Sequence, residues 1–134
     1  QTMSQEASFE QAVELYQASE YRQAIQLLEQ VVVDKPSSEA YHWLGKSYGR
    51  RAEQVALFRA LNYARKTRTA LEKAVELDQQ NRAAVKSLMK FHQQAPAIIG
   101  GSQARAQRLQ ERLAAMKYDE PAEPAYAPAA ETGQ

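Results

Sequence analysis

Apolar and small residues recur every three or four positions along most of the chain, which places them on one face of a series of helices. Between Gln5 and Ala18 this stripe consists of Phe9, Ala12, Val13, Leu15 and Tyr16. After a turn at residues 18–20, a second stripe follows and Pro36 closes it; its members are Ala24, Ile25, Leu28 and Val31. The pattern predicts two antiparallel helices that form a hairpin.

The same pattern returns twice further along the chain. Ser38 is expected to cap a third helix, whose inner face consists of Tyr41, Leu44, Gly45 and Tyr48. A near-heptad seam follows and predicts the partner helix; it contains Leu57, Leu61, Ala64, Leu71 and Val75. A third unit begins near Asn81, breaks at residues 96–101, and ends in a helix that Ser102 caps. The second unit is about ten residues longer than a 34-residue repeat, so both of its helices should be long.

Composition agrees with an all-helical fold, because helix formers dominate and Gly and Pro number only five each in 134 residues. A chain of this length fits one domain. We therefore predict a helical domain over residues 1–118. Residues 119–134 are acidic, rich in Pro and Ala and without apolar period, and are predicted to be an extended tail.

Three segments carry a resemblance to a known family. The predicted helix with Leu44, Gly45 and Tyr48 resembles the first helix of the tetratricopeptide repeat, with Tyr41 at the usual Trp position. The earlier segment with Ala24 and Pro36 resembles the second helix of the repeat. Thr67 stands at a position where the repeat has a small residue. The runs 44–54, 74–78 and 95–101 are similar to bacterial members with lengthened helices. The resemblance implies an all-α, right-handed stack of about three antiparallel helix hairpins. It also implies a concave face that binds peptides or proteins.

The resemblance further implies which residues face that groove. The family's groove positions correspond to His42, Lys46 and Arg50 in the second unit and to Lys86 and Lys90 in the third. Trp43 beside them either anchors a ligand or packs at the junction between repeats. Phe9, Val13 and Tyr16 either line the groove or fill the core. A basic groove of this kind suits an acidic peptide or a C-terminal carboxylate.

Charge is unevenly distributed although the net charge is only +1. Residues 1–44 carry seven acids and two bases, residues 45–117 fifteen bases and five acids, and residues 118–134 four acids and no base. This distribution favours an adaptor or scaffold that holds an acidic segment of a partner. Self-association stays open, with the acidic first hairpin or the tail of one copy on the basic middle of another.

Weak nucleic-acid binding is the other alternative, through a run of bases within nineteen residues: Arg50, Arg51, Arg59, Arg65, Lys66 and Arg68. These residues spread around the helix and lack the interleaved aromatic residues of a single-strand platform. Nucleic acid is therefore the less favoured partner.

The sequence contains no pattern typical of an enzyme, a metal site or a cofactor site. There is no cysteine, and His42 and His92 lie in different units without ligand spacing. Gly100 and Gly101 follow an apolar loop and not a strand, unlike a phosphate-binding loop. We predict a non-catalytic protein without cofactor.

No apolar run reaches the roughly 20 residues that a bilayer span requires, so a soluble chain without a membrane span is expected. Because the sequence starts at Gln1, we expect a periplasmic or cell-envelope location if a signal peptide has been removed, and a cytoplasmic one otherwise.

Overall fold

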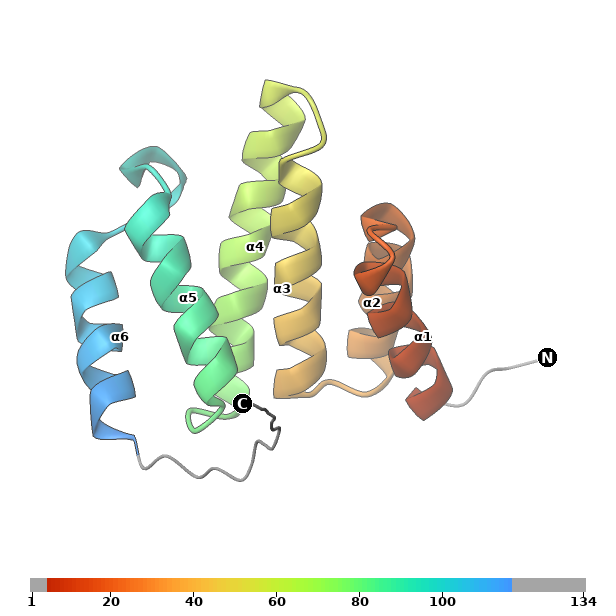
Figure 1. Cartoon of the computed structure of the whole chain (residues 1–134), viewed down its shortest axis with the longest axis horizontal. Helices are drawn as coiled ribbons and strands as arrows, with labels where there is room; N and C mark the ends of the chain where they lie inside the picture. Colours follow the sequence, from red (N-terminus) through yellow and green to blue (C-terminus); the bar gives the residue numbers. More distant parts are fainter. Residues whose placement is uncertain (1–4, 117–134) are drawn as a thin grey trace, which may run out of the picture.

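The computed structural model describes residues 5–116, and this part of the chain is all-helical without strands (Figure 1). Its elements in order are α1 (Gln5–Gln17), α2 (Tyr21–Asp34), α3 (Ser38–Ala52), α4 (Leu57–Leu77), α5 (Arg82–Gln94), the short 3₁₀ helix η1 (Ala97–Ile99) and α6 (Gln103–Ala115). The all-α prediction is confirmed. The predicted tail, residues 119–134, lies outside the described residues.

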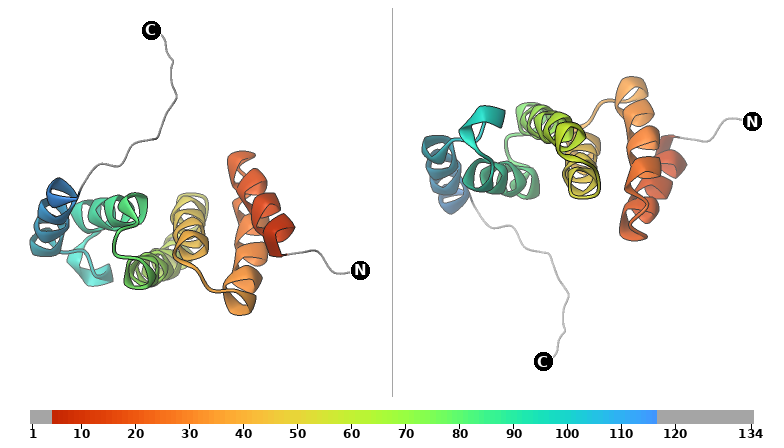
Figure 2. Two further views of the ribbon diagram at one scale, coloured as in Figure 1. Left: turned by 90° about the horizontal axis from the view of Figure 1, so that it is seen from below. Right: turned by 90° about the horizontal axis from the view of Figure 1, so that it is seen from above.

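Successive helices pair as hairpins, α1 with α2, α3 with α4 and α5 with α6, and the hairpins stand in a row (Figure 1). Helices α3 and α5 run in one direction, and α4 and α6 run in the other. Figure 2 shows α3 to α6 nearly end-on, whereas the first hairpin lies at an angle to them. Helix α3 also contacts α1, α2 and α5, and α4 contacts α5, so each hairpin packs on the next.

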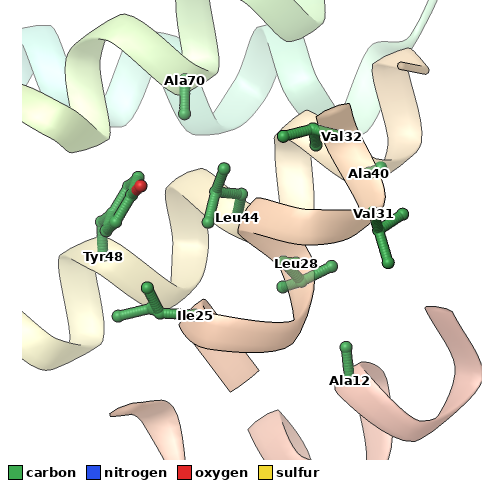
Figure 3. Close-up of a cluster of buried hydrophobic side chains, with 9 residues drawn as sticks. All are labelled: Ala12, Ile25, Leu28, Val31, Val32, Ala40, Leu44, Tyr48 and Ala70. Atoms are coloured by element: carbon green, nitrogen blue, oxygen red, sulfur yellow. The ribbon is translucent and has the colours of Figure 1, made fainter. Parts of the chain in front are cut away.

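Two clusters of buried side chains form the core and adjoin on α4. The first comes from α1 to α4 (Figure 3) and consists of Ala12, Ile25, Leu28, Val31, Val32, Ala40, Leu44, Tyr48 and Ala70. The second comes from α4 to α6 and consists of Leu71, Ala74, Val75, Ala84, Val85, Leu88 and Leu113. Because Ala70 and Leu71 are neighbours on α4, and Tyr41 packs against both clusters, the two cores are continuous.

A glycine allows α3 and α4 to pack closely. A Cβ atom on Gly45 would lie 2.8 Å from Cδ2 and 2.9 Å from Cγ of Leu71, and 3.4 Å from the Cβ of Ala70. The first two distances are too short for carbon atoms in contact, so Leu71 occupies the space that a side chain at residue 45 would need. The absence of a side chain at residue 45 therefore allows the close approach of the two helices.

The start of α3 differs from the prediction by one residue. Ser37, and not Ser38, is the cap, since its Oγ accepts the N–H of Ala40 at 3.0 Å. Ser38 already lies in the first helical turn, and its Oγ donates to the carbonyl of Ala74 at 2.6 Å and accepts from Nδ2 of Asn81 at 2.8 Å. The Ser38 hydroxyl therefore ties the start of α3 to the end of α4 and to the residue that precedes α5.

The cap predicted at Ser102 is confirmed, and Asn81, near which the third unit was expected to begin, caps α5. Oδ1 of Asn81 accepts the N–H of Ala84, and Oγ of Ser102 accepts the N–H of Arg105, each at 3.1 Å. Between α5 and α6 the chain reverses through η1, where Gly100 has φ +101°, in the region that favours glycine.

Only one helix of the second unit is unusually long. Helix α4 has 21 residues, whereas α3 has 15, hardly more than the 14 of α2. The seam predicted along α4 was wrong at its first residue: Leu57 is 69% exposed, since it begins the helix just after the turn, while Leu71 and Val75 are buried.

Replacing Gly45 with Leu should lower the free energy of unfolding by roughly 1–3 kcal/mol, because the new side chain overpacks the contact with Leu71. Denaturant unfolding followed by circular dichroism measures the change. Gly49→Ala is the matched control: its Cβ would meet Thr67 at 3.6 Å, an ordinary contact, and removing a mid-helix glycine should stabilise by about 0.5–1 kcal/mol. A Gly45→Leu variant as stable as the wild type would contradict the close packing.

Candidate functional site

Three of the predicted site residues form a cluster of cations and aromatic rings on α3. Trp43, Lys46 and Arg50 share one face of the helix because they are three and four residues apart. The Nζ of Lys46 lies 4.0 Å from the ring centroid of Trp43 and 5.2 Å from that of Tyr16 on α1. The guanidinium carbon of Arg50 lies 5.3 Å from the ring centroid of Tyr21, at the start of α2. The cluster thus joins α3 to the first hairpin.

The rings of this cluster pack edge to face. Tyr16 has its ring centroid 5.2 Å from that of Trp43, with the planes at 83°, and 5.2 Å from that of Tyr21, with the planes at 67°. Of the two roles considered for Trp43, the structure shows contact at the junction of the first two hairpins; Tyr16 is its partner there.

Partial burial shapes the electrostatics of the cluster. Burial lowers the pKa of Lys46, which lies half-buried over the rings. The face of an aromatic ring is electron-rich and attracts a cation by ~0.5–1 kcal/mol at exposed sites. Burial also raises the pKa of Tyr16, while the nearby charge of Arg50 acts in the opposite direction. The ammonium group of Lys46 therefore lies half-buried over the two rings.

His42 is inside the molecule and not on an open groove surface. Its Nε2 lies 2.8 Å from Oγ of Ser87, so this hydrogen bond joins α3 to α5. Burial, and secondarily the charge of Lys46, lowers the pKa of His42 to about 4. The ring is therefore neutral near pH 7 and acts as a link between hairpins.

Lys86 and Lys90 lie exposed one turn apart on α5, and neither forms an ion pair within residues 5–116. Helices α3 and α5 run in the same direction (Figure 1), and the bond from His42 to Ser87 fixes their register. Lys46 is one turn beyond His42, and Lys90 is three residues beyond Ser87. The structure thus places Lys46 and Lys90 at a similar level on neighbouring helices.

Sequence reasoning did not find the aromatic partners of these cations. Tyr16 and Tyr21 lie on either side of a short turn, and this spacing was the only indication in the sequence that both rings could face α3.

The sequence also did not predict a hydrogen bond between α2 and α3, in which the Tyr48 hydroxyl donates to Oε2 of Glu29 at 2.6 Å. Burial and this bond raise the pKa of Tyr48. Lys66 on α4 lies over the Tyr48 ring at 5.6 Å from its centroid, a further cation–aromatic contact outside the cluster of Trp43, Lys46 and Arg50.

The described part of the chain holds no group of three or more His, Asp and Glu side chains positioned to bind a metal ion. Among the helices of residues 5–116, none combines the length and apolar character needed to cross a bilayer.

Comparison of the chain with family models, curated proteins and solved structures found no match. The tetratricopeptide resemblance therefore stays a prediction from the residues that carry it.

Lowering the pH should weaken the folded state through His42. Its pKa is about 4 when folded and near 6.5 when unfolded. The contribution of neutral His42 to the free energy of unfolding is thus present above pH 6.5. It is lost as the pH falls toward 4, because the unfolded chain binds the proton more readily than the folded chain does. The stability difference between wild type and His42→Gln should shrink by about 2–3 kcal/mol between pH 7 and pH 4.5. Urea unfolding at both pH values measures it; a difference independent of pH would contradict the neutral buried ring.

Proposed function

We propose that this chain is a non-catalytic protein-interaction module, a tetratricopeptide-like stack of helical hairpins that acts as a scaffold or adaptor. Its binding surface is the face along α3 and α5, and its ligand is an acidic extended segment of a partner protein. The observation that carries the proposal is the His42–Ser87 hydrogen bond, which joins α3 to α5. The exposed Lys86 and Lys90 flank this point on α5, and Lys46 follows one turn later on α3.

The packing of the hairpins supports a repeat architecture. Each first helix of a hairpin contacts the first helix of the next, α1 with α3 and α3 with α5, while the second helices α2 and α4 contact the first helix that follows them. A single hairpin covers its apolar stripe on one side only, and stacking completes the burial. Such a stack leaves its first helices free to form one binding face.

The chemistry of the face supports an acidic ligand. Lys86 and Lys90 are exposed cations without an ion-pair partner in the described chain, so binding a carboxylate costs no existing contact. Lysine presents a compact, mobile charge that adapts to carboxylates along an extended segment. Trp43 and Tyr16, under the ammonium of Lys46, add apolar surface beside these charges.

A short glutamate-rich peptide should bind and change the fluorescence of Trp43, which is the only tryptophan of the chain and contacts Lys46. The double variant Lys86→Glu/Lys90→Glu should weaken this binding about tenfold, since two attractive charges become repulsive. Titration of Trp fluorescence at low salt gives both affinities, and rising salt should weaken wild-type binding.

Arg108→Glu is the control, because Arg108 is an exposed base on α6 and the cavity that it lines includes neither Lys86 nor Lys90. Its effect on peptide affinity should be small. Equal losses in the control and the double variant would show attraction to the general positive charge and would contradict a site on α3 and α5.

A further inference from the structure

The turn between α3 and α4 projects beyond the neighbouring helices (Figure 1). The residues that follow it carry exposed apolar side chains. Leu57 is 69% exposed and Phe58 is 86% exposed, in the first turn of α4. Leaving two large apolar side chains in water at a protruding point is unfavourable unless another surface covers them. We call Leu57, Phe58 and Arg59 the apolar tip.

The surroundings of the apolar tip are basic. Residues 50–59 contain three bases, Arg50, Arg51 and Arg59, against the single acid Glu53. Arg50 pairs with Glu53 at 3.5 Å, whereas Arg59 is exposed and forms no ion pair within the described residues. A surface that accepts this tip must therefore offer both an apolar hollow and negative charge.

A cavity with these properties lies at the opposite end of α3. It has a volume of about 280 Å³ and is bounded by the start of α1, the end of α2 and the start of α3. Its lining residues are Glu6, Phe9, Glu10, Val31, Lys35, Ser37, Glu39 and Ala40. We call it the acidic pocket, because three acids against one base surround a floor to which Phe9, Val31 and Ala40 contribute apolar surface.

The apolar tip cannot enter the acidic pocket of its own chain. Ala40 belongs to the first turn of α3, and the tip follows the last residue of the same helix, Ala52. A helix of 15 residues is about 22 Å long. The two surfaces are therefore held apart at opposite ends of a rigid element.

We propose that the apolar tip of one copy of this chain inserts into the acidic pocket of a second copy. Phe58 and Leu57 fill the apolar hollow, and Arg59 meets the carboxylates of Glu6 and Glu10. This contact is heterologous, because two different surfaces meet in it. One copy keeps its pocket free and the other keeps its tip free, so further copies can bind at both ends until a ring closes. The contact is independent of the proposed peptide-binding face, because Lys46, Lys86 and Lys90 take no part in it.

A second copy suits the tip better than an anionic membrane does. Both occupants would satisfy the arginines and cover Phe58, but a membrane leaves the acidic pocket without a role. The local charges are equal and opposite: the tip region has three bases and one acid, and the pocket has three acids and one base. This complementarity favours a contact between copies.

The average mass of the wild type, measured by sedimentation equilibrium at low salt, should rise with concentration beyond twice the 15.1 kDa of one chain. The tip variant Leu57→Asp/Phe58→Asp should stay monomeric, and its exposed positions leave the fold intact, as circular dichroism verifies. Ile98→Asp is the matched control, because Ile98 is 80% exposed on η1 and belongs to neither surface. This control should associate like the wild type.

Mixing two variants tests whether tip and pocket meet each other. The pocket variant Glu6→Arg/Glu10→Arg keeps an intact tip, and the tip variant keeps an intact pocket, so each alone should be monomeric. Their equimolar mixture should form dimers, because it brings together one intact tip and one intact pocket.

Three results would overturn the proposal: a wild type that is monomeric at every concentration, a tip variant that still associates, or a mixture that does not dimerise. A monomeric wild type that sediments with phosphatidylserine vesicles through Phe58 would assign the tip to a membrane surface instead. The peptide titration on the α3–α5 face is measured separately, so failure of one proposal leaves the other standing.

Discussion

The contact of α3 with α4 at Gly45 is the constraint on which the rest of the fold depends. Helix α3 contacts four other helices, and it reaches α4 closely because Leu71 occupies the place of the missing side chain at residue 45. The same stretch of α4 divides the core, since Ala70 faces one cluster and Leu71 the other. Any change that moves α4 away from α3 therefore opens both clusters together, and the interior behaves as one unit.

Much of the helical organisation could be predicted from the sequence, because helical period and capping residues are local properties. Asn81 and Ser102 cap the helices expected to follow them. Ser38 was harder, since two adjacent serines compete for one cap and the position of the first helical turn decides between them. The exposure of Leu57 depends on how far α4 extends past the neighbouring helices. The periodicity of apolar residues within one helix does not predict this extension.

The candidate site was less predictable, because its character comes from contacts between helices. A lysine at position 46 indicates a charge, but the rings of Tyr16 and Trp43 beneath it belong to the packing of α1 on α3. His42 occupies a position expected to face a groove, yet Ser87 lies 2.8 Å away on the next hairpin and binds it. By contrast, the exposure of Lys86 and Lys90 follows from the sequence of α5 alone. Val85, Leu88 and His92 form the buried side of this amphipathic helix, and the two lysines lie on its polar side.

The row of hairpins also separates charge along the molecule. The first hairpin, at one end of the row, carries most of the acids of residues 5–44, and the helices toward the other end carry most of the bases. Within residues 5–116, opposite ends of the row therefore carry charge of opposite sign. At physiological salt the Debye length is about 8 Å, shorter than α3 alone, so a charged surface senses only the end nearest to it. A charged partner should therefore meet the molecule in a preferred orientation, with the end of opposite charge toward it.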